Sequence, residues 1–103
     1  MVTKLDDKGF EVALKTSGKP VVVDFMTDWC PYCKLLAPIL EEIAKEHKDD
    51  IDVYYIDTDE HPDIAESYDI MAVPTVFVFK DGEVAGNAVN PKTRDALMQL
   101  IFK

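Results

Sequence analysis

The sequence is poor in several features that mark large classes of protein. It holds only two cysteines in 103 residues, too few for the disulfide framework of a small secreted domain. No apolar run approaches the ~20 residues that a membrane-spanning helix requires. Basic residues number 11 against 20 acidic ones, for a net charge of −9, so positive charge is scarce for binding nucleic acid or an anionic membrane. We therefore expect neither nucleic-acid nor membrane partners.

The rest of the composition is typical of a small globular domain. Apolar residues make up 48% of the chain, and a chain of this length can build one hydrophobic core but not two. No repeat, linker or low-complexity segment interrupts residues 1–103, so we predict a single domain and expect a monomer. The N-terminal segment lacks the basic start and apolar run of a signal peptide. We expect the chain in the cytoplasm.

Strands and helices are predicted to alternate along the chain. Residues 20–26 form a β-branched apolar run without alternation, the pattern of a strand buried on both faces. A hairpin is expected within residues 74–89, turning at Asp81-Gly82. The order β-α-β-α-β-α-β-β-α, with a short first strand, predicts an α/β protein with a mixed sheet covered on both faces. The other elements expected are helices over about 6–18, 31–48, 62–69 and 91–103 and a strand over 51–57. Gly18 is expected to end the first helix, and Leu35 is expected in the apolar stripe of the second, with Leu36, Ile39, Leu40, Ile43 and Ala44.

The only two cysteines, Cys30 and Cys33, could hold a metal, form a structural disulfide or exchange electrons. A closed zinc site needs four ligands, and the two histidines, His47 and His61, lie in distant segments. We expect no metal. A disulfide across two residues would close a very small loop and constrain the unfolded chain little. Redox chemistry is the interpretation that remains.

The position of the cysteines favours redox chemistry on physical grounds. Cys30 follows a predicted strand and begins a predicted helix, where free N–H groups and the helix dipole favour a thiolate. Pro31 suits the first helical position, which needs no N–H group. Cys33 lies one turn further in, and we expect it to be more buried. We predict that Cys30 attacks a target disulfide and that Cys33 resolves the mixed disulfide.

Resolution requires a proton acceptor near Cys33, and Asp24 is the candidate. It is the one charged residue in the run VVVDFM. Its carboxylate could reach water at a strand edge, or it could be buried. In the second case desolvation raises its pKa and makes it a usable base near neutral pH.

Two strings, VVVDFMTDWCPYCKLLAPILEEIAKE and AVPTVFVFKDGEV, resemble thioredoxin in order and spacing over nearly the whole chain. The resemblance implies the thioredoxin fold, a central mixed β-sheet flanked by four α-helices. It implies a protein-disulfide reductase with no cofactor beyond its redox-active Cys30–Cys33 disulfide. The implied partners are disulfide-containing proteins and an electron donor of the thioredoxin-reductase type.

The resemblance also implies a substrate groove beside the dithiol. Val73-Pro74 would carry a cis peptide bond, with the Val73 backbone pairing with an extended substrate segment, and Trp29 would contact that segment. From the residues alone, Pro74 could instead be an ordinary proline at a strand start, and Trp29 could belong to the core.

The chain departs from the thioredoxin pattern at several positions. Pro31-Tyr32 resembles glutaredoxin, whereas thioredoxins usually carry Gly-Pro there. Met26 replaces a common Trp, Asn90 replaces a groove Gly, and Tyr55 replaces a Lys near the buried Asp. The first two changes bear on substrate range, and the third bears on the pKa of the buried carboxyl group.

The Pro31-Tyr32 pair has a predicted consequence for the reduction potential. The N–H of Tyr32 is expected to point at the Cys30 sulfur, and an added donor stabilises a thiolate. This would move the potential from about −270 mV toward the glutaredoxin range of about −200 to −230 mV. The Tyr32 ring is expected to border the groove.

Two other functions are consistent with parts of the sequence. A glutaredoxin-like, glutathione-dependent reductase would share the CPYC string, but the Gly pair that such a site needs after the hairpin is absent from GEVAGNAVNPKT. A non-catalytic thioredoxin-fold binding module would use the Pro74 groove without turnover.

Overall fold

The computed structural model describes residues 2–102, which form strands and helices in the predicted order β-α-β-α-β-α-β-β-α. The elements are β1 (Val2–Lys4), α1 (Asp7–Thr16), β2 (Val21–Met26), α2 (Pro31–Glu46), β3 (Asp52–Asp57), α3 (Pro62–Ser67), β4 (Thr75–Lys80), β5 (Glu83–Val89) and α4 (Arg94–Phe102).

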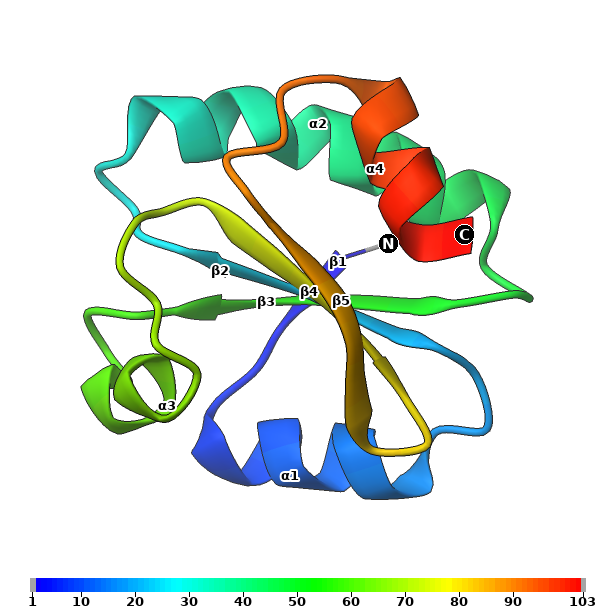
Figure 1. Ribbon diagram of the computed structural model, residues 1–103, viewed down its shortest axis with the longest axis horizontal. Helices are drawn as coiled ribbons and strands as arrows, with labels where there is room; N and C mark the ends of the chain where they lie inside the picture. The colour runs from blue at the N-terminus through cyan, green and yellow to red at the C-terminus, as the bar shows by residue number, and fades with distance from the viewer. Residues whose placement is uncertain (1, 103) are drawn as a thin grey trace.

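The strands form one mixed sheet in the order β1-β3-β2-β4-β5 (Figure 1). β3 pairs in parallel with β1 and β2, whereas β4 pairs antiparallel with both β2 and β5. β2 therefore lies at the centre of the sheet, where both faces are covered by helices. This explains why its sequence, VVVDFM, is apolar without alternation.

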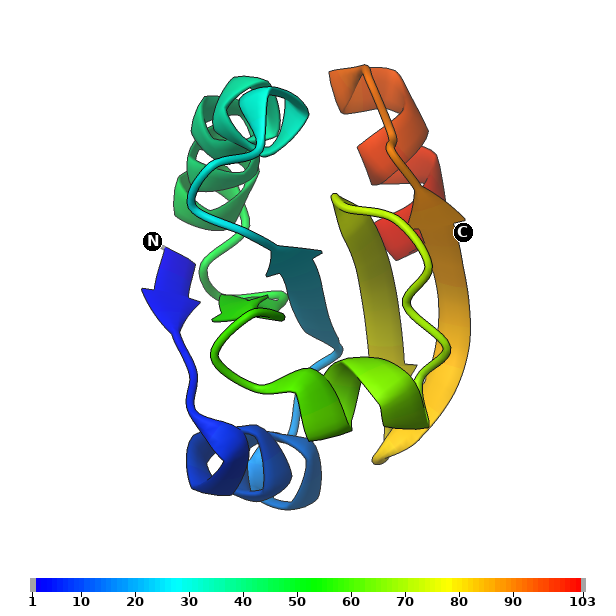
Figure 2. The same ribbon diagram turned by 90° about the vertical axis from the view of Figure 1, so that its left-hand side faces the viewer.

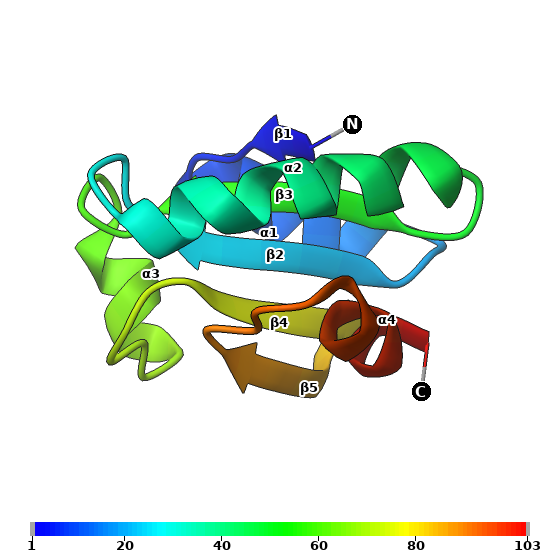
Figure 3. The ribbon, with the colours of Figure 1, turned by 90° about the horizontal axis from the view of Figure 1, so that it is seen from above.

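Helices α2 and α4 cover one face of the sheet, and α1 and α3 cover the other (Figures 1 and 3). Side chains of β2 alternate between these two layers. Val21, Val23 and Phe25 pack in the α1 layer, while Val22 packs in the α2 layer. The same alternation places Asp24 on the α2 face. The predicted α/β class and thioredoxin fold are confirmed.

Local signals set the ends of α1. The Asp6 side chain caps the N-terminus by accepting a hydrogen bond from the Gly9 N–H at 2.7 Å, as short acidic side chains do at this position. The helix ends at Thr16 with Ser17 as the C-terminal cap, two residues before the Gly18 expected to end it.

Helix α2 continues through Pro38 and presents one apolar face to the sheet. Leu36, Leu40 and Ile43 are buried at helical spacing. Leu35 was expected in the same stripe, but 67% of it is exposed. One residue corresponds to about 100° around a helix, so Leu35 points away from the sheet that buries Leu36.

The hairpin between β4 and β5 turns at the predicted pair. Asp81 has φ 55° and Gly82 has φ 80°. Two successive residues with positive φ are the requirement of the type I′ turn that Asp-Gly favours. The predicted turn is confirmed.

One end of the molecule brings several loops together. Figure 2 faces this end, where the loop from β2 into α2, helix α3 and the loop into β4 lie beside one another. Cys30 ends the first of these loops, and Cys33 lies in the first turn of α2. No helix within residues 2–102 is both long enough and apolar enough to cross a membrane.

Candidate active site

Cys30 is the N-cap residue of α2. Its backbone is extended, with φ −80° and ψ 116°, and Pro31 occupies the start of the helix. The Cys33 N–H donates a hydrogen bond to the Cys30 sulfur at 3.2 Å. The sulfur thus takes the place of the oxygen that usually caps a helix, among N–H groups that have no partner inside the helix. Cys30 lies where the sequence predicted it.

The prediction of which N–H donates to this sulfur was wrong. Tyr32 was assigned that role, but the amide that donates is that of Cys33. An N-cap side chain reaches the second or third N–H of its helix, and here it reaches the third. The extra hydrogen bond that was expected to raise the reduction potential is therefore not made. The Tyr32 ring is 55% exposed and borders the groove as expected.

The two thiols are free and differ little in burial. Cys30 is 3% exposed and Cys33 is 2% exposed, so the expected contrast in burial is small. They differ in direction instead, because Cys30 lines the surface groove and Cys33 does not. The Cys30 thiol also lies 3.7 Å from the Val73 carbonyl oxygen. Access from the groove thus distinguishes the two sulfurs.

The loop before β4 is held beside Cys30 at several points. The Val73-Pro74 peptide bond is cis, as the thioredoxin resemblance implied. The Thr75 hydroxyl donates to the Ala72 carbonyl, and the Asn90 N–H donates to the Pro74 carbonyl, both at 2.7 Å. Pairing between β2 and β4 begins only at Thr75, so the Val73 backbone lies outside the sheet ladder.

Asp24 is buried on the α2 face. It is 3% exposed, and its Oδ1 atom has no hydrogen-bond partner within residues 2–102. Burial raises the pKa of this carboxyl group to about 7. Tyr55 stands beside it in the pairing of β2 with β3, at the position where thioredoxins commonly have Lys. Of the two environments considered for Asp24, the structure has the buried one.

The Cys33 thiol is strongly biased toward its protonated form. Burial raises its pKa to about 12, and the hydrogen bond with Cys30 and the charges of Cys30 and Asp24 act in the same direction, while the Thr27 backbone acts against them. Contributions from Cys30 would fall once its sulfur is bonded to a target. Cys33 therefore needs a proton acceptor, and Asp24 is a charged neighbour that acts on its pKa.

A groove of about 800 Å³ opens beside Cys30. Trp29 and Tyr32 line it from the α2 side, and Met71 and Val73 from the loop before β4. Trp29 is 68% exposed, which excludes the core position that the sequence left open for it. Pro31 lines the same groove next to the reactive sulfur, and Pro74 is fully buried behind it.

Two groove residues, Asp59 and Met71, were not anticipated from the sequence. The Trp29 indole N–H donates to the Asp59 carboxylate at 2.8 Å, and Met71 is 92% exposed. Neither residue carries a local signal of its position, because the segment after β3 and the loop before β4 meet the start of α2 only in the folded chain.

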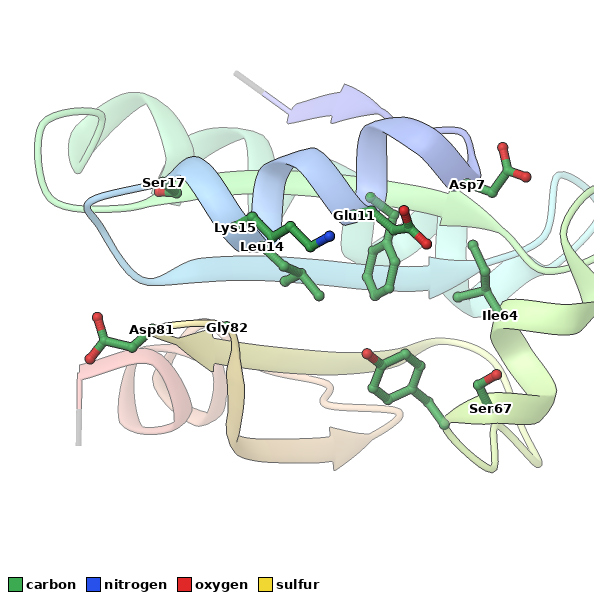
Figure 4. Close-up of a pocket in the computed structure, with 11 residues that line it drawn as sticks. Asp7, Glu11, Leu14, Lys15, Ser17, Ile64, Ser67, Asp81 and Gly82 are labelled. Atoms are coloured by element: carbon green, nitrogen blue, oxygen red, sulfur yellow. The ribbon is translucent and has the colours of Figure 1, made fainter.

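A second hollow, of about 850 Å³, lies away from the cysteines (Figure 4). It is formed by α1, α3 and the β4–β5 turn, with Glu11, Lys15 and Asp81 at its border. It contains no thiol, so we assign the redox site to the groove at Cys30.

A dithiol at a helix N-terminus, opposite a cis-proline loop on a mixed α/β sheet, defines the class of thiol-disulfide oxidoreductases. The family model described as Thioredoxin matches residues 1–103. The chain belongs to the thioredoxin family.

Known relatives agree with this assignment. The chain is 40% identical over 96 residues to a thioredoxin of Mycobacterium tuberculosis (strain H37Rv), covering 93% of this chain and 83% of that protein. It is 39% identical over 102 residues to a thioredoxin of Bacillus subtilis (strain 168), covering 99% and 96%.

A solved structure is also similar. It comes from work on the thiol resolving mechanism in yeast mitochondrial 1-Cys peroxiredoxin via glutathione/thioredoxin systems. Its chain superposes with a TM-score of 0.87 at 30% identity, covering 98% of this chain and 93% of that one.

Proposed function

We propose that this chain reduces disulfide bonds of protein substrates through a cycle of Cys30 and Cys33. The observation that carries the proposal is the Cys30 sulfur, which accepts the Cys33 N–H at the start of α2 and opens onto the groove. A thiolate in this place is stabilised by helix N–H groups and can be reached by a target disulfide.

The reaction takes two steps. The Cys30 thiolate attacks one sulfur of the target disulfide, forming a mixed disulfide and releasing the other target sulfur as a thiolate that takes up a proton. Cys33 then loses its proton and attacks the Cys30 sulfur. The second target sulfur leaves, and two electrons have passed to the target while Cys30 and Cys33 become a disulfide.

We assign proton acceptance in the second step to Asp24. Its burial, its pKa of about 7 and its effect on Cys33 support this role. A carboxylate with a pKa near the working pH can both accept a proton and return it.

We assign substrate binding to the groove walls on both sides of Cys30. An extended segment would pair with the Val73 backbone next to Pro74, while the exposed rings of Trp29 and Tyr32 and the Pro31 ring would contact its side chains. The exposure of both rings and the position of Val73 outside the sheet ladder support this arrangement.

We further propose a cytoplasmic monomer that needs no cofactor beyond its dithiol. An electron donor of the thioredoxin-reductase type would reduce the Cys30–Cys33 disulfide after each cycle. A net charge of −9 supports the absence of nucleic-acid and membrane partners. One relative, from Spinacia oleracea, is named a chloroplastic M-type thioredoxin and is 39% identical over 102 residues, although the chain covers only 56% of it.

Reduction of insulin tests the proposal. The oxidised chain is supplied with NADPH and a thioredoxin reductase, and precipitation of the insulin B chain is followed by turbidity. We expect turnover by the wild-type chain and none by Cys30→Ser. No turbidity from the wild type with any donor, including glutathione with its reductase, would leave only the binding-module alternative. Equal turbidity from both proteins would contradict the role of Cys30.

A further inference from the structure

The wall of the Cys30 groove on the α3 side is acidic. Asp59, Glu66 and Asp69 line the groove together with Cys30 and Trp29. No Lys, Arg or His lines the groove within residues 2–102. The reactive sulfur thus shares its groove with negative charge only.

These three carboxylates are not neutralised by ion pairs inside the described chain. Lys4, Lys19 and Arg94 pair with acidic residues elsewhere. The Asp59 carboxylate accepts a hydrogen bond from the Trp29 indole N–H. This neutral donor leaves the negative charge of Asp59 in place. A concave site lined by one sign of charge focuses the electrostatic potential and raises the local concentration of ligands of opposite charge.

The opposite side of Tyr32 is different in character. A smaller hollow of about 360 Å³ is lined there by Leu35, Ile39 and Asn90, and its one charged residue is Lys92. The two sides of the dithiol therefore differ in charge, and a bound segment would experience that difference along its length.

We propose that the groove selects target segments with a Lys or Arg next to the reactive disulfide, on the side that faces α3. This inference rests on the proposed function and names the class of substrate within it. Glu66 and Asp69, both exposed and free of ion pairs among the described residues, are its specificity-determining residues.

The apolar part of the same groove suits such a segment. Met71 is 92% exposed and Trp29 is 68% exposed, so both can contact the methylene groups of a long cationic side chain. A cation above the Trp29 ring gains a further attraction.

Three synthetic peptides test the inference. Each carries the same disulfide and apolar residues, and only the flanking position varies, as Lys, Gln or Glu. We expect kcat/KM with the wild-type chain to rank Lys above Gln above Glu, with about three- to tenfold between Lys and Glu, as for rim charges at an interface. The ranking should shrink at about 0.5 M salt, because the charges are exposed to solvent.

The variant Glu66→Gln/Asp69→Asn removes two charges from the groove. A matched control, Glu11→Gln/Asp81→Asn, removes two charges beside the hollow on the other side of α3. Asp69 and Asp81 have nearly the same left-handed backbone, φ 53° and 55°, which Asn tolerates. Because Asp59 keeps its charge in this variant, we expect the difference between the three peptides to be reduced rather than abolished. The control should keep the full wild-type ranking.

The possible results separate two failures. No ranking in the wild type, or loss of ranking in the control as well as in the groove variant, overturns the inference while the proposed function stands. No reduction of the Gln peptide by the wild type contradicts the proposed function itself.

Discussion

The Cys30 sulfur lies 3.7 Å from the Val73 carbonyl oxygen, although the two residues are 43 positions apart in the chain. This contact joins the start of α2 to the loop before β4. A target segment that pairs with the Val73 backbone must therefore pass the reactive sulfur. The proposed binding of a target and the attack on its disulfide would then take place at one site.

Replacement of the resolving thiol should trap the reaction halfway. With Cys33→Ser, Cys30 can still attack a target, but no second thiol releases it. We expect a mixed disulfide with insulin that non-reducing electrophoresis and mass spectrometry detect. Cys30→Ser, the matched control, should give no adduct. An adduct through Cys33 in that control would reverse the roles of the two cysteines.

The role of Asp24 as a base should be visible in the pH dependence of resolution. The carboxylate form is needed, and it predominates above the pKa of about 7. The rate of resolution in single-turnover experiments should therefore rise as the pH increases through about 7. Asp24→Asn should resolve more slowly and lack this inflection. Identical profiles for both proteins would rule out the role.

Asp24 should also make stability depend on pH. Its pKa is raised from 3.8 unfolded to about 7 folded, so the folded state holds the proton more tightly. Asp24 therefore stabilises the folded state fully below about pH 4, and this stabilisation is lost as the pH rises through about 7. At ~1.4 kcal/mol per pKa unit, the loss amounts to up to about 4 kcal/mol.

Asp24→Asn isolates this effect. We expect urea unfolding to find the variant more stable than the wild type by about 2 to 4 kcal/mol at about pH 8. The difference in the free energy of unfolding should narrow toward about pH 4 and below, where Asp24 becomes protonated in the unfolded state as well as in the folded one. A difference that does not change with pH would mean that the carboxyl group is ionised in the folded state at all these values.

The contact between Trp29 and Asp59 should hold the indole in place. Asp59→Asn keeps an acceptor oxygen for the Trp29 N–H, whereas Asp59→Leu removes it. Because the chain has one Trp, fluorescence anisotropy reports this ring alone. We expect faster ring motion and a KM raised by about two- to fivefold for Asp59→Leu, as for loss of one hydrogen bond at an exposed site. Equal anisotropy in the two variants would contradict the positioning role.

Asn90 should tolerate Gly but not Val. It has φ 48°, in the left-handed region that Asn and Gly enter most easily. We expect Asn90→Val to lower the free energy of unfolding by about 1 to 2 kcal/mol, and Asn90→Gly to change it by less than about 1 kcal/mol. Urea unfolding measures both. Equal stability of the Val and Gly variants would show that the backbone relaxes at this position.

The position of the dithiol could be predicted because its determinants are local. An apolar β-branched run, a cysteine at the N-cap and Pro31 directly after it fix the strand-to-helix turn within a few residues. The donor to the Cys30 sulfur could not be predicted, since the N–H groups of Tyr32 and Cys33 are neighbours in the first helical turn and an N-cap side chain can reach either one. The exposure of Leu35 escaped prediction because Leu35 differs from Leu36 only by a rotation around the helix.

The sequence by itself determined the order of the elements, the hairpin turn and the pair of cysteines, because helical periodicity, turn chemistry and N-capping act over short stretches of chain. Only the tertiary structure decided which segments meet at Cys30. The central place of β2 buries Asp24 beneath α2 and raises its pKa, and the order of the strands brings α3 and the Val73 loop beside the sulfur. These contacts depend on pairing between distant residues, and local sequence carries no signal of them.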